Sequence, residues 1–194
     1  MPSRVPLTVL SGNCSIDDLP DQLDLSELAD DMERLWEKSM ARLSEGIVAE
    51  YAATIVILAN GSLKLVNEVV GSPSNVVPNW SVAGFVGTFH THPRTDGFLP
   101  MPFSHADFVS AIQLREKLSL LYSDELVFAL ARTTTTANDV NLYEIQNEFL
   151  AVVMDPALRA GFLPTAVWTA NKWLAEKYGF GLYMGTPNEI FREV

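Results

Sequence analysis

All three histidines of this 194-residue chain lie in one short stretch, residues 84–108, which reads GFVGTFHTHPRTDGFLPMPFSHADF. The part before the first histidine is apolar, β-prone and bounded by glycine, so we expect His90 and His92 at the end of a strand. Residues two apart on a strand share a face, so both imidazoles point the same way and Thr91 points away. Pro93 then ends the strand.

The same stretch changes to a helical pattern after a loop rich in proline and glycine. We expect this helix to run from Ser104 to about residue 122, with Ser104 and Asp107 together in its first turn. His105 lies on the other side of that turn, so we expect it to be solvated or to lie behind the ligands. By itself, S-x-x-D at a helix start is an N-cap followed by a first-turn acid.

Two imidazoles and one carboxylate that converge on a point form a three-ligand set, and the fourth tetrahedral position stays open for water. That arrangement is typical of a catalytic zinc site rather than a structural one. We therefore predict a zinc ion held by His90, His92 and Asp107. A lone H-x-H is usually incidental, but H-T-H-P followed after ten residues by S-H-A-D is more specific.

Glu50 is the one charged residue in the apolar run 47–58. Burying an ionised carboxylate without a partner is costly, so Glu50 should pair, lose its charge or have a chemical function. A salt-bridged glutamate at a sheet edge is the structural alternative. Glu68 is a competing acid in the more polar strand that follows, and Glu45 reads as the tail of the preceding helix.

These residues resemble the JAMM (MPN+) zinc metalloproteases, whose signature is a distant glutamate, then H-[ST]-H-P, then S-x-x-D. The resemblance covers residues 25–146. It implies an α/β fold of the MPN/JAB type, similar to cytidine deaminases, in which a mixed β-sheet is flanked by helices. In this family the two histidines and the aspartate bind zinc.

The resemblance also assigns roles to two further residues. Glu50 would act as the general base that takes a proton from a metal-activated water, and Ser104 would help hold the tetrahedral intermediate. The implied reaction is hydrolysis of a peptide or isopeptide bond. The implied partner is a protein or peptide substrate, with a ubiquitin-like tail as one candidate.

The loop between the two halves of the signature, residues 94–103, is longer than the family usually has. It carries four large apolar side chains beside a polar site, namely Phe98, Leu99, Met101 and Phe103. We therefore predict that this loop contacts the substrate or a partner.

Two other functions belong to different classes. A scaffold of the same fold without turnover is one, but the complete ligand set counts against it. A DNA-repair module of the RadC type is the other, since such proteins share the H-x-H-P and S-x-x-D halves. The net charge of -11 argues against a nucleic-acid partner, which needs a basic surface.

A chain with 48% hydrophobic and 19% charged residues fits one compact domain. We divide it into an N-terminal segment, residues 1–24, a metalloprotease-like core, residues 25–146, and a helical C-terminal extension, residues 147–194, packed on the same domain. Its aromatic side chains are expected to pack against the sheet; these are Trp168, Trp173, Phe180 and Tyr183.

Local patterns predict the elements of the sheet and its helices. Strands are expected at residues 5–10, 47–58, 63–70, 84–89 with the histidines at its end, and 126–132, the last paired with 141–145 in a hairpin. Helices are expected at residues 26–45, 104–122, 147–154 and 165–177, before a final segment at 178–185.

The single cysteine, Cys14, excludes an internal disulfide and any zinc site built from cysteines. The N-terminus has too short an apolar run for a secretory signal, and no stretch approaches the roughly twenty apolar residues that cross a bilayer. We therefore expect a cytoplasmic protein with no membrane partner.

Overall fold

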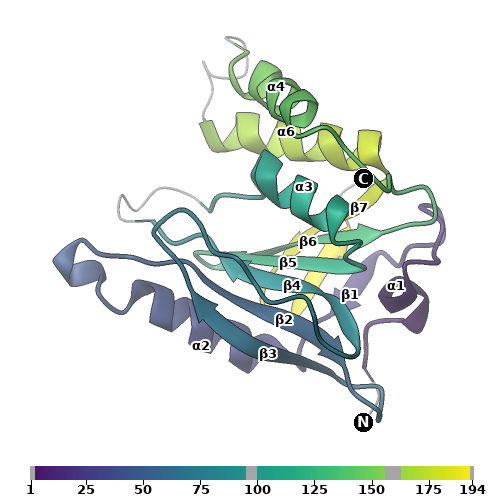
Figure 1. Ribbon diagram of the computed structural model, residues 1–194, viewed down its shortest axis with the longest axis horizontal. Helices are drawn as coiled ribbons and strands as arrows, with labels where there is room; N and C mark the ends of the chain where they lie inside the picture. Colours follow the sequence, from purple (N-terminus) through teal and green to yellow (C-terminus); the bar gives the residue numbers. More distant parts are fainter. Residues whose placement is uncertain (1–2, 95–99, 156–162, 193–194) are drawn as a thin grey trace.

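The computed structural model describes residues 3–94, 100–155 and 163–192. In this part of the chain the strands form one mixed sheet with helices on both faces (Figure 1). The α/β class, with a mixed sheet flanked by helices, is therefore confirmed. None of the described helices combines the length and apolarity that a membrane span requires.

The strands within the described residues are β1 (Gln22–Asp24), β2 (Tyr51–Ile57), β3 (Leu63–Val70), β4 (Phe85–Thr91), β5 (Leu118–Ser123), β6 (Leu126–Arg132), β7 (Phe180–Gly185) and β8 (Glu189–Arg192). Their order across the sheet is β1-β8-β7-β6-β5-β4-β2-β3. Only the β4–β5 pair among these is parallel. Strands from both ends of the chain thus meet at one edge, where β1 pairs with β8.

The helices are α1 (Leu7–Ser11), α2 (Ala29–Met40), the 3-10 turn η1 (Leu43–Glu45), α3 (His105–Gln113), α4 (Leu142–Val153) and α6 (Leu163–Tyr178). In Figure 1, α2 lies against one face of the sheet, and α3, α4 and α6 lie over the other. Each face has its own apolar core. Leu120 of β5 joins the core under α2, whereas its neighbour Leu121 joins the core under α3, as expected for alternating strand residues.

Several predicted elements are confirmed. Strands β3 and β6 have the predicted bounds. Strands β2 and β3 are antiparallel neighbours, and Asn60 and Gly61 lie in the connection between them. Gly61 has φ of 81°, a left-handed conformation that glycine adopts without steric cost. Gly46, at φ 72°, ends η1.

The helix predicted from residue 104 to 122 was wrong in its second half. Helix α3 ends at Gln113, Arg115 takes φ of 54°, and the following residues form β5. All six residues of β5 are buried, because β5 lies between β4 and β6 in the middle of the sheet. A strand buried on both faces has a continuous apolar sequence, which periodicity cannot distinguish from a buried helix.

The hairpin predicted between residues 126–132 and 141–145 was also wrong. The partners of β6 are β5 and β7, and residues 142–145 instead start helix α4. Asn141 caps this helix, since its side chain accepts hydrogen bonds from the backbone N–H groups of Tyr143 and Glu144. The helix predicted at 147–154 is the remainder of α4.

The two ends of the chain differ from expectation as well. Residues 5–10, predicted as a strand, contain the short helix α1, which Gly12 closes in a left-handed conformation. The segment predicted as a helical extension contributes α6 as expected, but its last part forms β7 and β8 of the same sheet.

The aromatic residues predicted to pack against the sheet divide into two kinds. Tyr183 and Phe180 are buried, and Trp168 lies with its ring centroid 5.7 Å from that of Phe128 on β6. Trp173 was predicted wrongly, because it lies on the outer side of α6 and is 38% exposed.

Candidate metal centre

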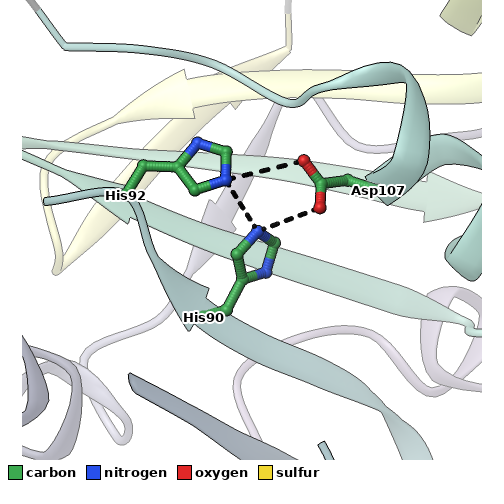
Figure 2. A group of neighbouring side chains, drawn as sticks. All are labelled: His90, His92 and Asp107. Atoms are coloured by element: carbon green, nitrogen blue, oxygen red, sulfur yellow. Dashed lines mark hydrogen bonds and ion pairs between the residues drawn. The ribbon is translucent and has the colours of Figure 1, made fainter. Parts of the chain in front are cut away.

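Strand β4 directs the two histidines to one side, as predicted. Thr91 points to the opposite face, where its Oγ1 lies 2.6 Å from Ser39 Oγ on α2 and accepts a hydrogen bond from the backbone N–H of Tyr51. His90 and His92 both turn towards α3 and converge on Asp107 (Figure 2). His90 is only 8% exposed, so this side of the site is shielded from bulk water.

The carboxylate comes from the first turn of α3, whose N-cap is Ser104. The Ser104 backbone N–H donates to Asp107 Oδ2 at 2.7 Å, and the Ser104 hydroxyl donates to the same oxygen at 2.8 Å. The backbone N–H of Asp107 in turn reaches Ser104 Oγ at 3.4 Å, which completes a capping box. The same hydrogen bonds therefore cap helix α3 and orient the candidate ligand Asp107.

The three side chains have the spacing of tetrahedral zinc ligands. The Nε2 atoms of His90 and His92 are 3.2 Å apart, and Asp107 oxygens lie 3.2 Å from His90 Nε2 and 3.6 Å from His92 Nε2. With Zn–N and Zn–O bonds of about 2.0–2.1 Å, two ligands on a tetrahedron are separated by about 3.3 Å. The observed distances match this value, and the imidazole and carboxylate donors suit zinc.

At two of the three candidate ligands, His92 and Asp107, the protonation state favours metal binding. Burial lowers the pKa of His92 to about 4, so at neutral pH its imidazole is uncharged and its lone pair is free for a metal. Burial would raise the pKa of Asp107, but the adjacent histidines and its hydrogen bonds outweigh burial and hold the pKa well below its usual value. His90 differs, because its burial lowers the pKa but the adjacent Asp107 carboxylate outweighs burial and raises it. A metal ion would therefore have to displace a proton from this imidazole.

Glu50 lies beside this centre, directly before β2. It is 7% exposed, and its backbone continues the pairing with the β3 side through Gly71 and Ser72. Burial raises the pKa of Glu50 to about 7; His90 opposes this shift and Asp107 adds to it. The charged groups that act on Glu50, His90 and Asp107, are thus members of the candidate centre. Neither is the lysine or arginine partner that a salt-bridged edge glutamate would require.

The competing acids lie elsewhere. Glu68 on β3 accepts ion pairs from Arg34 and Lys38 of α2, which lower its pKa to about 2. Glu45 in η1 pairs with Arg42. Neither acid lines the cavity described next.

A cavity of about 240 Å³ opens beside the three candidate ligands. Glu50 and Ser104 line it, together with Thr88, Ser110, Leu114, Glu116 and Ser119 from the strands and the helix. Its remaining wall is the loop between β3 and β4, including Val77 and Trp80, which are 65% and 47% exposed. The cavity therefore has an acidic interior and an apolar rim.

The loop predicted to contact substrate has a different position at its described end. Phe103 is fully buried, with its ring centroid 6.3 Å from that of His90, so its predicted contact with substrate was wrong. Met101 is half-buried against the core under α3. Phe98 and Leu99 fall outside the described residues. Among the described residues, the apolar rim comes from the β3–β4 loop, whose residues carry no chemical signal in the sequence.

Two more residues near the centre escaped prediction. Glu116 is 1% exposed at the inner end of the cavity, where it accepts a hydrogen bond from Thr88 Oγ1 at 2.9 Å. Asn171 of α6 is fully buried and donates to the backbone carbonyl of Phe103 at 2.8 Å. His105, predicted to be solvated or behind the ligands, is half-buried and packs against Phe149.

Comparison of the sequence with protein-family models and with curated proteins found no match. The functional proposal therefore depends on the residues and the geometry of the site.

Proposed function

We propose that this protein is a zinc-dependent hydrolase that cleaves a peptide or isopeptide bond. The observation that carries the proposal is the spacing of His90, His92 and Asp107, which suits a tetrahedral metal with one position open, next to the buried carboxyl group of Glu50. The resemblance to the JAMM metalloproteases supports the same reaction and the MPN/JAB type of fold.

The three ligands supply two neutral donors and one negative charge. Zinc held in this way lowers the pKa of a bound water to near neutrality and polarises the carbonyl of a scissile amide. The capping box keeps the Asp107 carboxylate in place, because both the backbone N–H and the hydroxyl of Ser104 donate to its Oδ2. Such supporting hydrogen bonds fix the orientation of ligands before the metal arrives.

Glu50 acts as the proton carrier in this proposal. A general base is most effective when its pKa lies near the working pH, and the pKa of Glu50 is about 7. It accepts a proton from the attacking water and transfers it to the nitrogen of the leaving amine. Its burial keeps bulk water from competing for that proton.

Ser104 has a hydroxyl that can serve two acceptors in turn. In the structure the hydroxyl donates to Asp107. When negative charge develops on the substrate carbonyl oxygen, rotation about the Cα–Cβ bond would redirect the hydroxyl to it. A donor in this position contributes about 3 kcal/mol to the transition state.

The cavity favours a polypeptide substrate without acidic groups next to the scissile bond. The carboxyl groups of Glu50, Asp107 and Glu116 lie in its interior, and none of the described residues that line it is a lysine or an arginine. The exposed Val77 and Trp80 on the rim offer apolar contacts for a chain that enters from solution. A ubiquitin-like tail is the polypeptide substrate that the resemblance to the JAMM metalloproteases implies.

The test compares zinc-loaded wild type with Glu50→Gln on a peptide library and on ubiquitin-like fusions joined through peptide and isopeptide bonds. Glutamine keeps the shape of glutamate but cannot accept the proton, so we expect hydrolysis to fall by at least about 100-fold with zinc retained. Glu68→Gln is the matched control and should cleave like wild type.

Two results would contradict the proposal. Zinc-loaded wild type that cleaves none of these substrates would favour the scaffold function. Undiminished cleavage by Glu50→Gln would show that another group carries the proton.

A further inference from the structure

A short segment, residues 101–103, lies against both histidines of the metal centre. The backbone of its first two residues, Met101 and Pro102, lies close to the His92 imidazole. The ring of its third residue, Phe103, packs beside the ring of His90, with 6.3 Å between the centroids. Phe103 is fully buried, so a shift of this segment would displace both imidazoles.

The same segment leads directly into the third ligand. Ser104 follows Phe103, and its backbone N–H and hydroxyl both hold Asp107 Oδ2. The carbonyl of Phe103 and the N–H of Ser104 belong to one planar peptide group. Whatever fixes the Phe103 carbonyl therefore also fixes the N–H group that orients the Asp107 carboxylate.

Two side chains from distant parts of the chain hold this segment at its ends. At the first end, the Met101 N–H donates to Ser123 Oγ at 3.0 Å, and the Ser123 hydroxyl donates to the His92 carbonyl at 3.1 Å. At the other end, Asn171 Nδ2 donates to the Phe103 carbonyl at 2.8 Å. Asn171 belongs to α6, 68 positions further along the chain.

Asn171 is an unusual residue for its surroundings. It is fully buried among the apolar residues of the core under α3, including Ala170 and Leu174 of its own helix. Its Nδ2 also donates to the Val167 carbonyl at 3.0 Å, while its Oδ1 has no hydrogen-bond partner among the described residues. An amide that is only half satisfied in such a core costs stability, which an apolar residue of similar size would avoid.

From these contacts we propose that Asn171 is a positioning residue of the metal centre. Its amide fixes the Phe103 carbonyl, and through residues 101–103 and Ser104 it holds His90, His92 and Asp107 in the geometry that binds zinc. The C-terminal helix is in this way part of the site. This inference rests on the proposed zinc centre and extends it to a residue that does not touch the metal.

The test is the zinc affinity of full-length Asn171→Leu, measured by competition with a chromophoric chelator. Leucine has a similar size but cannot donate a hydrogen bond, so we expect zinc to bind about 10-fold to 100-fold more weakly, the usual effect of losing a residue that orients ligands. The melting temperature without metal should fall only slightly, because leucine removes a half-satisfied amide but leaves the Phe103 carbonyl without its donor. The absorption spectrum of bound Co²⁺ should also change, because it reports ligand geometry.

Thr169→Ala is the matched control, because Thr169 lies on the same helix and its hydroxyl donates to the exposed Thr165 carbonyl, its one hydrogen-bond partner among the described residues. It should leave zinc affinity and the Co²⁺ spectrum unchanged. Asn171→Ala is a second variant that also lacks the donor and introduces no larger side chain. It should show the same weakening of zinc binding.

The outcomes separate this inference from the proposed function. Wild type that binds no zinc would overturn both. Wild type that binds zinc, together with an Asn171→Leu variant of equal affinity and equal Co²⁺ spectrum, would overturn the inference alone. If neither Asn171 variant folds, Asn171 is a residue of the core and its positioning role is wrong.

Discussion

A buried carboxyl group can exchange protons with a substrate only when its neutral and charged forms are close in free energy at the working pH. Glu50 meets this condition, since burial raises its pKa to about 7. The same burial has a cost, because the charged form is less stable inside the folded protein than in water. Function and stability at this residue therefore make opposite demands.

This conflict predicts how stability depends on pH in the metal-free protein. The pKa of Glu50 is about 7 when folded, against an ordinary value of 4.5. Between these values the unfolded chain has released a proton that the folded protein keeps, so the stability that Glu50 contributes falls as pH rises from about 4.5 to about 7 and then stays constant. Glu50→Gln lacks this loss.

Chelator-treated Glu50→Gln should accordingly be more stable than wild type above pH 7, by roughly 3 kcal/mol, and similar to it near pH 4.5. Urea unfolding at a series of pH values measures this difference. Glu68→Gln serves as the control for a surface acid, and its free energy of unfolding should be lower than that of wild type by at most about 1 kcal/mol. A Glu50→Gln variant less stable than wild type at neutral pH would mean that Glu50 has a cationic partner in solution.

At the scale of the element, Ser104 has two roles at the N-terminus of α3: it caps the helix, and in our proposal its hydroxyl takes part in hydrolysis. Two substitutions distinguish these roles. Ser104→Ala removes both the cap and the hydroxyl, and it should lower the free energy of unfolding by about 1 kcal/mol. Ser104→Asn keeps a good N-cap and should be nearly as stable as wild type. Both should reduce hydrolysis by about 100-fold or more. Wild-type hydrolysis by Ser104→Asn would reduce Ser104 to a cap.

The pairing of β4 with β5 depends on a close approach at Gly87. A Cβ atom at this position would lie 1.9 Å from the carbonyl oxygen of Leu118, so Gly87→Ala must force the two strands apart. We expect the free energy of unfolding to fall by about 3 kcal/mol and zinc to bind more weakly, because β4 carries His90 and leads directly into His92. Apart from its neighbours in the chain, a Cβ atom at Gly46 would meet no described residue within 4 Å. Gly46→Ala should therefore lower the free energy of unfolding by only about 1 kcal/mol, because an alanine must adopt the left-handed backbone conformation there. Equal losses for the two variants would contradict the close-packing explanation.

The elements differ in how far their sequences predict them. Strand β3 has a turn signal before it and alternating polar residues, so its period is visible. Strand β5 has neither, since the sheet covers it on both edges and cores cover it on both faces. The start of α4 was predicted as a strand because NLYEI is too short to show a helical period, although Asn141 is a recognisable N-cap.

At the scale of the whole molecule, the candidate site combines ligands that are close together in the sequence with residues from distant segments of the chain. The ligands lie within 18 positions of one another, so residue types and spacing were enough to predict His90, His92 and Asp107 as a group. The cost of burying its charge singled out Glu50, and the resemblance to the JAMM metalloproteases assigned it the role of general base. Glu116, Asn171 and the rim residues Val77 and Trp80 act only through tertiary contacts, and their sequence neighbourhoods carry no sign of them.

Zinc stoichiometry tests the central claim most directly. Elemental analysis of the full-length protein, purified at neutral pH with zinc supplied and excess metal removed, should find about one zinc per chain, and His90→Ala and Asp107→Ala should each lose it while keeping their fold. Folded wild type without zinc, or variants that retain a full equivalent of it, would contradict the assignment of these residues as a metal centre.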